Sequence, residues 1–296
     1  MKIGVWGLGS IGSRHARNLQ SLGCEVIGYD IAPYLELARL KNEGEPIDYN
    51  TPDKMKNCDG IVIATPTNTH HDILRYVIKN FKAKTIFIEK PVASSSRKLR
   101  NVVRRMPSSR NVFVGHNLRF HSCVIRAKKD LPKIGNPIWA HFTVAQYTDK
   151  APYLRDGVIL NWGVHEIDVA LHLLGPGKVV SGYGDNTMAD FVVKHDRGCI
   201  STFHVDYLSE REIRSFVIQG EKQIILADLV DRAYLQSGEF ANKGEILSGS
   251  FASDYVDEMG EFIQVAKGRK NKRLATLPEG IAALKIAEQA MKACGI

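Results

Sequence analysis

Two short segments of this chain combine residue types that bind and use a dinucleotide. The first is the glycine-rich run Gly7-Leu8-Gly9-Ser10-Ile11-Gly12, and the second is Glu89-Lys90-Pro91, which ends an apolar run. Glycines at the first, third and sixth positions are typical of a pyrophosphate-binding turn. A lysine in this setting is suited to proton transfer beside a bound nicotinamide ring. Together the two segments favour an oxidoreductase that uses a nicotinamide dinucleotide.

The glycine run stands in the strand, turn and helix context that such a site requires. Lys2 to Trp6 is predicted to form a buried strand, and Ser13 to Leu22 is predicted to form a helix. Gly7 then permits the tight turn, Gly9 lets the backbone approach the pyrophosphate, and Gly12 lets helix and strand pack closely, with the phosphates at the helix N-terminus. The alternative is a plain strand-turn-helix that binds nothing.

An acidic residue at the end of the second predicted strand indicates which cofactor is used. The strand Glu25 to Tyr29 ends on Asp30, roughly 20 residues beyond the glycines, where a carboxylate binds the ribose hydroxyls. The carboxylate would repel the extra phosphate of NADP, and no arginine follows it immediately, Arg39 being the nearest. The sequence therefore predicts NAD in preference to NADP.

Alternating strand and helix patterns up to residue 117 predict a doubly wound parallel sheet of the Rossmann type. Ile61 to Ala64, Thr85 to Ile88 and Asn111 to Gly115 are its further predicted strands. Ligands of such sheets lie beyond the carboxyl ends of the strands. The residues that follow those ends are therefore predicted to contact the cofactor: Thr65, Pro66, Asn68, His70, Glu89 and Lys90. Asn68 or Thr69 is expected to cap the helix that follows.

The pattern changes after residue 117 to a helical stretch, Arg119 to Leu131, and then to alternating strands. The predicted strands are Ile138 to Tyr147, Val179 to Tyr183, Phe191 to His195, Cys199 to Tyr207, Ile213 to Gln219 and Gln223 to Ala227. Two helices, Asp254 to Ala266 and Pro278 to Ala293, complete the chain. We therefore expect a dinucleotide-binding domain over 1–117 and a second, α+β domain over 118–296.

Size and composition favour a two-domain cytoplasmic enzyme and exclude several other classes. At 296 residues the chain exceeds the size at which one core stops growing. No apolar run approaches the roughly 20 residues that span a bilayer, and no leader precedes the first strand, so no membrane partner is expected. The five cysteines are widely spaced and never in Cys-x-x-Cys pairs, which indicates neither a disulfide framework nor a metal site.

The net charge of +8 does not by itself indicate a nucleic-acid partner. Lys and Arg are spread over several predicted helices, and no nucleic-acid-binding module is present. The densest basic stretches, Arg97 to Arg105 and Lys267 to Arg273, are predicted to be solvated helix faces or turns. The charge suits an anionic substrate such as a nucleotide sugar or a sugar acid.

Four motifs in this order resemble the glucose-fructose oxidoreductase/inositol dehydrogenase/MocA family of NAD(P)-dependent oxidoreductases. They are the glycine run, Ala64-Thr65-Pro66 with His70, Glu89-Lys90-Pro91, and the segment Gly157 to Asp168, and the resemblance covers nearly the whole chain. It implies a second domain with an open, mostly antiparallel sheet that supports a homodimer or homotetramer. It also implies a last helix that packs back on the first domain and, commonly, a cis bond before Pro91.

The resemblance assigns Lys90 to substrate binding and proton transfer. Near the cationic ring of oxidised nicotinamide, and partly desolvated, the lysine would have its pKa lowered toward the working range. The expected reaction moves a hydride between nicotinamide and a secondary carbinol of a sugar, sugar acid or nucleotide sugar. The alternative for Lys90 is a surface lysine in a salt bridge.

The second catalytic candidate is His165. On a helix Asn161, His165 and Asp168 would project from one face. The family has an acid and a histidine at the first and fifth positions of this block, and both meet the substrate beside the lysine. Here the first position is Asn161, which cannot exchange protons. His165 is then a base or an orienting group, or else a helix histidine satisfied by Asp168.

Asn161 leaves two functions open. In the first the enzyme turns over, with proton transfer at Lys90 and His165 and with Asn161 and Asp168 binding substrate. In the second the protein binds NAD without turnover, as a sensor or an assembly subunit.

The substrate candidates come from the segment Val114 to His121, which looks like a segment of family members linked to surface-sugar biosynthesis. Asn117 and Arg119 would then face the nicotinamide end and the substrate. Arg119 would either pair with a carboxylate or phosphate in bidentate fashion or join the two domains. Further pocket candidates are His116, His121, Tyr147, Tyr153 and Arg155.

Overall fold

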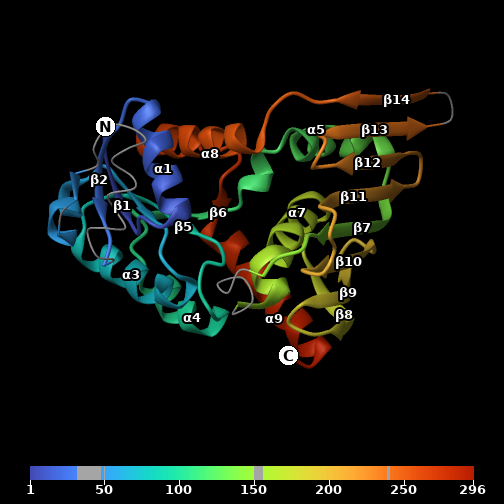
Figure 1. Cartoon of the computed structure of the whole chain (residues 1–296), viewed down its shortest axis with the longest axis horizontal. Coiled ribbons are helices and arrows are strands. Elements are labelled where there is room, and N and C mark those ends of the chain that lie inside the picture. Colours follow the sequence, from blue (N-terminus) through green and yellow to red (C-terminus); the bar gives the residue numbers. More distant parts are fainter. Residues whose placement is uncertain (32–47, 50, 150–155, 239–240) are drawn as a thin grey trace. The chain divides into compact units, whose positions relative to one another are not determined.

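The computed structural model describes residues 1–31, 48–49, 51–149, 156–238 and 241–296 and contains two compact units (Figure 1). The first unit comprises residues 1–117 and 251–280, and the second comprises 118–250 and 281–296. The chain returns to the first unit after residue 250, which a single boundary does not describe.

The first unit is built on a seven-stranded sheet with the order β15-β6-β5-β4-β1-β2-β3. Its strands are β1 (Lys2–Trp6), β2 (Glu25–Tyr29), β3 (Asp48–Tyr49), β4 (Gly60–Ile63), β5 (Thr85–Glu89), β6 (Asn111–Gly115) and β15 (Ala275–Thr276). All neighbours pair in parallel except β15 with β6. This confirms the predicted doubly wound sheet. The strand order changes direction between β1 and β4, which is where ligands of such sheets bind.

Helices cover both faces of this sheet. They are α1 (Ser10–Ser21), α3 (Thr67–Asn80), α4 (Ser96–Arg105) and α8 (Phe251–Ala266). In Figure 1, α1 and α8 lie together on one face and α3 and α4 on the other. Helix α1 begins at Ser10, so Gly12 is in its first turn. The predicted cap of α3 is wrong, because Pro66 is its N-cap and the Thr69 hydroxyl oxygen lies 2.8 Å from the Thr65 hydroxyl oxygen.

The second unit is built on an eight-stranded sheet with the order β14-β13-β12-β11-β7-β10-β9-β8. Its strands are β7 (Pro137–Ala145), β8 (Gly177–Gly184), β9 (Met188–His195), β10 (Ile200–Asp206), β11 (Ile213–Gly220), β12 (Ile224–Asp228), β13 (Ala233–Gly238) and β14 (Ala241–Ile246). Only β7 and β10 pair in parallel, which confirms an open and mostly antiparallel sheet. Strands β13 and β14 were not predicted.

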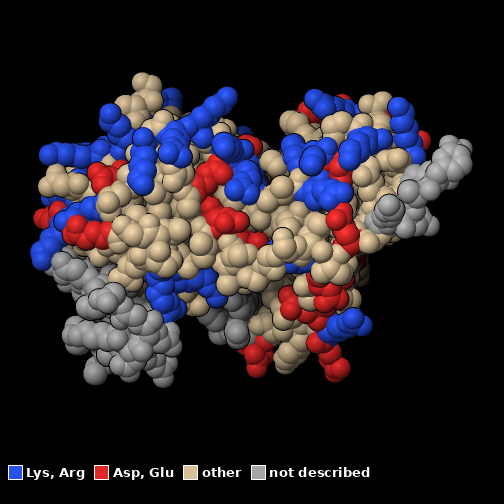
Figure 2. All heavy atoms as spheres, turned by 90° about the horizontal axis from the view of Figure 1, so that it is seen from above, with Lys and Arg blue, Asp and Glu red and all other residues tan. Residues whose placement is uncertain are grey.

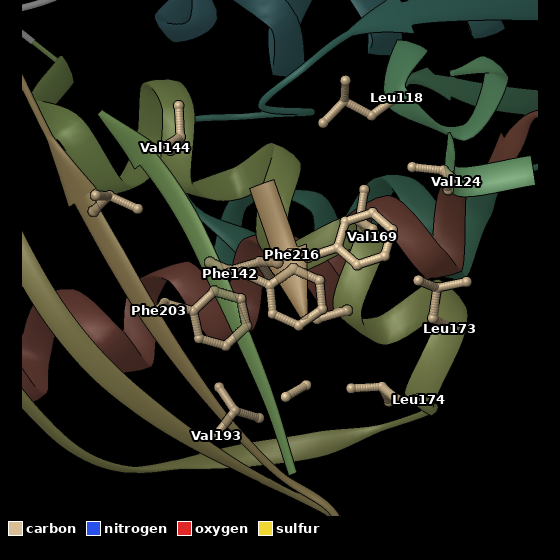
Figure 3. Packing of buried hydrophobic residues seen from close by; sticks show 14 of the residues in the cluster. Leu118, Val124, Phe142, Val144, Val169, Leu173, Leu174, Val193, Phe203 and Phe216 are labelled. Carbon is tan, nitrogen blue, oxygen red and sulfur yellow. The ribbon is translucent and has the colours of Figure 1, made fainter. Parts of the chain in front are cut away.

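One face of this sheet is covered by helices and forms the core of the unit. Phe142 of β7 stacks on Phe203 of β10 and lies against Phe216 of β11 (Figure 3). Val169 and Leu173 come to the same cluster from α7 (Val164–Leu174). The last helix, α9 (Leu277–Cys294), begins in the first unit and continues through the second. Burial of these large side chains, each worth about 1.5–3 kcal/mol, holds the helices on one face.

The predicted helix Arg119 to Leu131 is interrupted. A 3₁₀ turn, Asn117–Phe120, comes first, and α5 (Ser122–Asp130) then begins with His121 as its N-cap. The His121 Nδ1 atom accepts a hydrogen bond from the backbone N–H of Cys123 at 3.2 Å. A second 3₁₀ turn, Leu131–Ile134, follows, in which Pro132 cannot donate to a preceding carbonyl. The apolar spacing alone did not indicate the cap.

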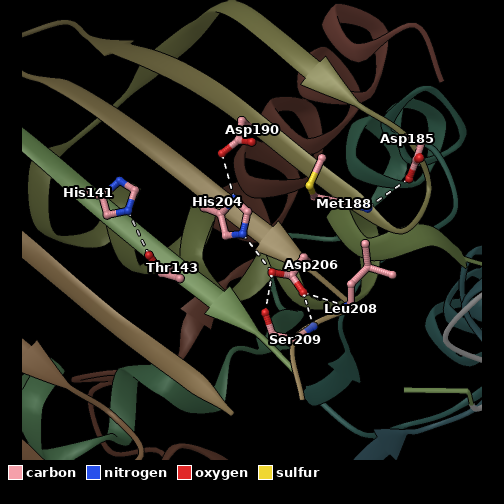
Figure 4. Close-up of polar contacts among 9 residues, drawn as sticks. All are labelled: His141, Thr143, Asp185, Met188, Asp190, His204, Asp206, Leu208 and Ser209. Atoms are coloured by element: carbon pink, nitrogen blue, oxygen red, sulfur yellow. Dashed lines mark hydrogen bonds and ion pairs between the residues drawn. The ribbon is translucent and has the colours of Figure 1, made fainter. Parts of the chain in front are cut away.

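A polar network lies on the opposite, half-exposed face of the second sheet (Figure 4). The two ring nitrogens of His204 lie 2.9 Å from Asp190 Oδ1 and 2.9 Å from Asp206 Oδ2. Burial opposes the charged ring, but the hydrogen bonds to the two carboxylates raise the pKa of His204 above its usual range. Burial and the charge of His204 lower the pKa of the neighbouring His141.

We expect His204→Gln to change the pH dependence of stability. A histidine whose folded pKa is raised stabilises the fold below its unfolded pKa, about 6.5, and the gain is lost as the pH rises through the folded pKa. The melting temperature of the variant should therefore be lower than that of the wild type at pH 6 and approach it by pH 9. Because His204 is partly exposed, the effect should stay below about 1 kcal/mol. The matched control His141→Gln should show the opposite sign, and equal profiles for both variants would contradict the assignment.

Candidate functional site

The glycine run forms a tight loop between β1 and α1. Gly7 has a positive φ of 94°, and a Cβ atom on it would lie 2.5 Å from the carbonyl oxygen of Ala64. A Cβ atom on Gly12 would lie 1.9 Å from the Gly7 carbonyl oxygen. A Cβ atom on Gly9 would meet no described atom within 4 Å. The first and third glycines are thus required by the fold of the loop, and the second leaves the backbone open to a ligand.

The N-terminus of α1 is open to an anion. Gly9 is its N-cap, and among the described side chains none makes a capping hydrogen bond there. Ser10 is exposed and Ile11 is half-buried, whereas the Ser13 hydroxyl donates to the Leu8 carbonyl oxygen at 2.6 Å. Backbone N–H groups in the first turn of a helix lack partners within the helix and attract phosphates.

Asp30 lies beside this loop at the end of β2. Its Oδ2 atom accepts a hydrogen bond from the backbone N–H of Leu8 at 2.5 Å. This hydrogen bond fixes the direction of the carboxylate. Asp30 is half-buried, so the carboxylate remains accessible to solvent. This places a negative charge next to the glycine turn, within the first unit.

The loop after β4 carries the next candidates. Pro66 and Asn68 are exposed, and Thr65 is half-buried. His70 is buried, and its two ring nitrogens lie 2.7 Å from the Thr65 carbonyl oxygen and 2.9 Å from that of Pro91. A neutral ring has one N–H, so it donates to one of these carbonyls at a time. Both nitrogens face protein atoms, and His70 connects the loop after β4 with the turn after β5.

The turn after β5 presents Lys90. The Lys90–Pro91 peptide bond is cis, and the Lys90 side chain is half-buried. The preceding Glu89 is buried, and its Oε1 atom lies 2.6 Å from His15 Nε2. Burial alone would raise the pKa of the Glu89 carboxyl, but the hydrogen bond from His15 and the positive charges of His15 and Lys90 lower it. A charged carboxylate therefore lies directly before the lysine.

In the second unit the candidate residues lie where a π-helical turn is followed by an α-helix. Ile159–Gly163 is a π-helical turn, and α7 begins directly after it. Asn161 lies in the π-helical turn and is half-buried, whereas His165 and Asp168 lie in α7 with 8% and 1% of their surfaces exposed. The expected single α-helical face thus holds for His165 and Asp168 but not for Asn161, because a π-turn bonds residue i to i+5. Such turns frequently occur at functional sites.

Arg119 and Asp168 form a buried ion pair. Arg119 Nε lies 2.8 Å from Asp168 Oδ2, and Arg119 Nη2 lies 2.7 Å from Oδ1. Only 4% of Arg119 and 1% of Asp168 are exposed. The bidentate geometry predicted for Arg119 is present, but its carboxylate comes from Asp168 of the same unit rather than from a substrate.

The other pocket candidates have different surroundings. His121 caps α5 and has its Nε2 atom 3.0 Å from the Leu229 carbonyl oxygen, and burial and the charge of Arg232 lower its pKa to about 4. His116 is buried, and Tyr147 is 60% exposed. Tyr153 and Arg155 lie outside the described residues. Both ring nitrogens of His121 are therefore engaged within the second unit, where the residue caps a helix.

Asn117 is the candidate whose buried side chain has an open donor. It is 2% exposed, and its Nδ2 atom has no hydrogen-bond partner among the described residues. Buried amide groups in folded proteins are nearly always hydrogen-bonded, so a donor of this kind is a natural partner for a ligand oxygen.

Two polar pairs were missed by the sequence analysis. Arg214 Nε donates to Glu166 Oε1 at 2.7 Å, and His15 contacts Glu89. His15 had one available signal, since it is a polar residue on the apolar face of a predicted helix that follows a glycine run. Glu166 and Arg214 are 48 residues apart, and no local spacing connects them.

Charges and cysteines add no further site within the described part of the chain. On the displayed face many Lys and Arg side chains lie along the upper edge, and Asp and Glu side chains form separate groups (Figure 2). The described residues contain no cluster of three or more His, Cys, Asp or Glu side chains that could hold a metal ion. No helix in the described ranges is long and apolar enough to cross a membrane. All five cysteines are free thiols, and burial raises the pKa of Cys58 and of Cys199 to about 11.

Comparison with known proteins relates both parts of the chain to one group. Residues 1–116 match a family model described as "Oxidoreductase family, NAD-binding Rossmann fold". Residues 133–295 match its companion, "Oxidoreductase family, C-terminal alpha/beta domain".

Individual relatives agree with these matches. Myo-inositol 2-dehydrogenase of Thermotoga maritima is 32% identical, over 90% of this chain and 88% of its own. The NAD(+)-dependent scyllo-inositol 2-dehydrogenase of Bacillus subtilis is 26% identical, over 77% of this chain and 74% of its own. A crystal structure of an oxidoreductase from Agrobacterium radiobacter with NAD+, L-tartaric acid and magnesium has a TM-score of 0.88 at 17% identity, covering 100% of this chain and 96% of its own.

Proposed function

We infer the function of this protein from the premise that the chain belongs to the Gfo/Idh/MocA family of oxidoreductases. It is an NAD-binding oxidoreductase of the type that acts on CH–OH groups of sugars, inositols or nucleotide sugars. We propose more specifically that it transfers a hydride between NAD and a secondary carbinol of a polyhydroxylated ring. The observation that carries this proposal is the turn after β5, where the Glu89 carboxylate is held by hydrogen bonds and Lys90 directly follows the carboxyl end of the strand.

The residues of the first unit fit NAD. The open turn at Gly9 and the N-terminus of α1 would hold the pyrophosphate, and the Asp30 carboxylate would accept hydrogen bonds from a ribose. Thr65, Pro66 and Asn68 lie on the neighbouring loop, and His70 holds that loop against the turn of Lys90. NAD, when bound, accepts or supplies the hydride.

Asp30→Ala should shift the coenzyme preference toward NADP. Removing the carboxylate deletes both a ribose acceptor and the charge that repels a 2′-phosphate, each worth about 1–1.5 kcal/mol, so the ratio of NAD to NADP affinities should fall about tenfold or more. Coenzyme titration followed by protein fluorescence measures both affinities. Asp59→Ala is a matched control, since its carboxylate accepts from the backbone of Lys2 at the opposite end of β1. An unaltered ratio in Asp30→Ala would refute the ribose role.

Proton transfer is proposed for Lys90 and His165. A carbinol oxidised by hydride loss must also lose its hydroxyl proton, and a side chain must accept it at that oxygen. Lys90 is proposed to take this proton, and His165 to orient the substrate hydroxyl or to act as a second base. Asn161 is proposed to bind a hydroxyl through its amide, because it cannot exchange protons. Asn117 is proposed to donate its buried Nδ2–H to the nicotinamide end or to the substrate.

The experiment is a spectrophotometric screen. Purified protein with NAD or NADP is given inositols first, then sugars, sugar acids and nucleotide sugars, while the absorbance of the reduced nicotinamide is followed. Turnover of a ring polyol supports the proposal and identifies the substrate class. Tight NAD binding without turnover across the panel would instead favour the function as a sensor or assembly subunit. The surface-sugar role predicted from Val114 to His121 would be supported by turnover of a nucleotide sugar.

We also propose that the protein is a homodimer or homotetramer through the outer face of the second sheet. That face carries half-exposed apolar side chains on three adjacent strands, among them Trp139 of β7, Ile200 of β10 and Ile213 of β11. An apolar face of a large sheet is stabilised by burial against a partner. Light scattering behind gel filtration gives the mass, and Trp139→Glu should shift it toward the monomer.

A further inference from the structure

A buried histidine on the dinucleotide-binding helix contacts the carboxylate that precedes Lys90. His15 lies on α1 and is fully buried. Its ring lies edge-on to Phe87 of β5 and to Tyr255 of α8, with centroids 5.4 and 5.9 Å apart. Its Nε2 atom lies 2.6 Å from Glu89 Oε1, and a carboxylate only accepts hydrogen bonds, so Nε2 is the donor.

The other ring nitrogen shows that this contact sets the orientation of His15. The Nδ1 atom is buried and has no hydrogen-bond partner among the residues that the structure describes. A buried polar atom left without a partner costs about 1–3 kcal/mol. Because no second hydrogen bond to a described residue competes for the ring, the bond to Glu89 alone directs it.

Glu89 transmits this contact to the lysine. Its second oxygen, Oε2, accepts a hydrogen bond from the backbone N–H of Lys90 at 3.1 Å. Gly115 on the adjacent strand lies so close that a Cβ atom there would be 3.0 Å from both carboxylate oxygens. The carboxylate therefore has one partner on each oxygen and little room to turn.

The pair is poorly explained by stability alone. Replacing a buried ion pair by apolar residues of similar volume is often neutral or stabilising, because desolvation of the charges offsets their attraction. Phe87 and Tyr255 already provide an apolar setting for a leucine at position 15. What a leucine would lose is the hydrogen bond that fixes Glu89 and, through it, the amide of Lys90.

We propose that His15 is a positioning residue for Lys90, acting through Glu89. The inference rests on the proposed role of Lys90 in proton transfer. It connects two parts of the first unit, since the helix that begins at the glycine turn also fixes the backbone from which the lysine side chain extends. Without the hydrogen bond between His15 and Glu89, the turn that carries Lys90 would sample orientations in which the lysine ammonium group does not reach the reacting oxygen. Misplacement of about 1 Å can lower a rate 100-fold.

The test compares His15→Leu with His15→Gln in the full-length protein. Glutamine places an amide N–H near the position of Nε2, whereas leucine fills the space without a donor. His195→Leu is the matched control, since His195 is also a buried histidine with two hydrogen bonds, to Gly175 and Ser201 in the second unit. Replacing His195 by leucine should lower the melting temperature without changing hydrogen exchange at the Lys90 amide.

Hydrogen exchange at the Lys90 amide is the readout that needs no substrate. Residue-resolved exchange mass spectrometry should show at least tenfold faster exchange of this amide in His15→Leu, and near wild-type exchange in His15→Gln and in the His195→Leu control. With the substrate found in the screen, kcat should fall at least tenfold in His15→Leu with KM changed less than threefold, and His15→Gln should recover most of it.

The outcomes separate this inference from the proposed function. Unchanged exchange at Lys90 in His15→Leu overturns the inference, as does a kcat loss in His15→Gln equal to that in His15→Leu. A Lys90→Ala variant that keeps its turnover overturns the role of Lys90 instead, whatever the exchange data show. Faster exchange at Lys90 with full kcat means that the contact exists but does not position the lysine for catalysis, which also overturns the inference.

Discussion

Lys90→Ala is expected to lower kcat by about 10²–10⁴-fold while NAD binding changes little. The range is the usual contribution of a positioned general acid or base, and alanine removes the amine that is proposed to accept the hydroxyl proton. The glycine turn and Asp30 are proposed to bind the other end of the coenzyme, so the affinity for NAD should change less than threefold. Single-turnover measurement of hydride transfer, with coenzyme titration in parallel, separates the two effects.

Lys84 provides the control within the same strand. It is an exposed lysine directly before β5, whereas Lys90 directly follows β5. Lys84→Ala removes an equal charge from the opposite end of the strand and should leave kcat within twofold of the wild type. If Lys90→Ala retained normal turnover, or if both variants lost it equally, the assignment of proton transfer to Lys90 would be wrong.

The sequence predicted most of the first unit because its signals are local. A glycine run after a buried strand, and an acid at the end of the next strand, each describe one turn of backbone. Glu25–Tyr29 and Asn111–Gly115 are strands with the predicted bounds, and the Rossmann sheet and the mostly antiparallel second sheet are confirmed. Gly7 and Gly12 lie where only glycine fits the loop.

The features that were missed depend on distant partners or on weak patterns. Strands β13 and β14 contain polar residues and glycines without clear alternation, and they are formed by pairing to β12 and to each other. The break before α5 comes from His121 accepting the Cys123 N–H, which an apolar period does not show. The His15 contact joins residues 74 positions apart. Tertiary pairing decided the strands and the His15 contact, whereas the break before α5 depends on a local side-chain cap.

The candidate site shows the same limit. The types of the residues were informative, since Lys90 directly follows a strand of the dinucleotide-binding sheet and His165 lies on a helix that follows a π-turn. The partners that these residues contact could not be predicted from the sequence. Asp168 was predicted to bind substrate because it shares a helix face with His165, and only the fold shows that both of its oxygens accept from Arg119.

Asp168→Asn is expected to destabilise the second unit by about 3–5 kcal/mol. The substitution keeps the shape of the side chain but removes the charge of Asp168 from its buried pair with Arg119, and breaking a buried pair at one partner costs this much. At about 2–4 °C per kcal/mol for a unit of this size, the melting temperature should fall by roughly 10 °C. Calorimetry measures the shift. Asp53→Asn is the control, because Asp53 pairs with Lys56 on the surface and should change the melting temperature by about 1 °C or less.

The double variant Arg119→Met/Asp168→Leu distinguishes the buried pair from a substrate contact. Removing both charges of the pair together avoids breaking it at one partner, so the double variant should be more stable than Asp168→Asn alone. If instead Asp168→Asn kept the wild-type melting temperature and raised the KM of the substrate found in the screen, Asp168 would be a substrate ligand, as its position beside His165 first indicated. The bidentate geometry and the burial of both side chains favour the first result, because an arginine whose Nε and Nη2 both bond to Asp168 presents less of its guanidinium to a ligand than the sequence implied.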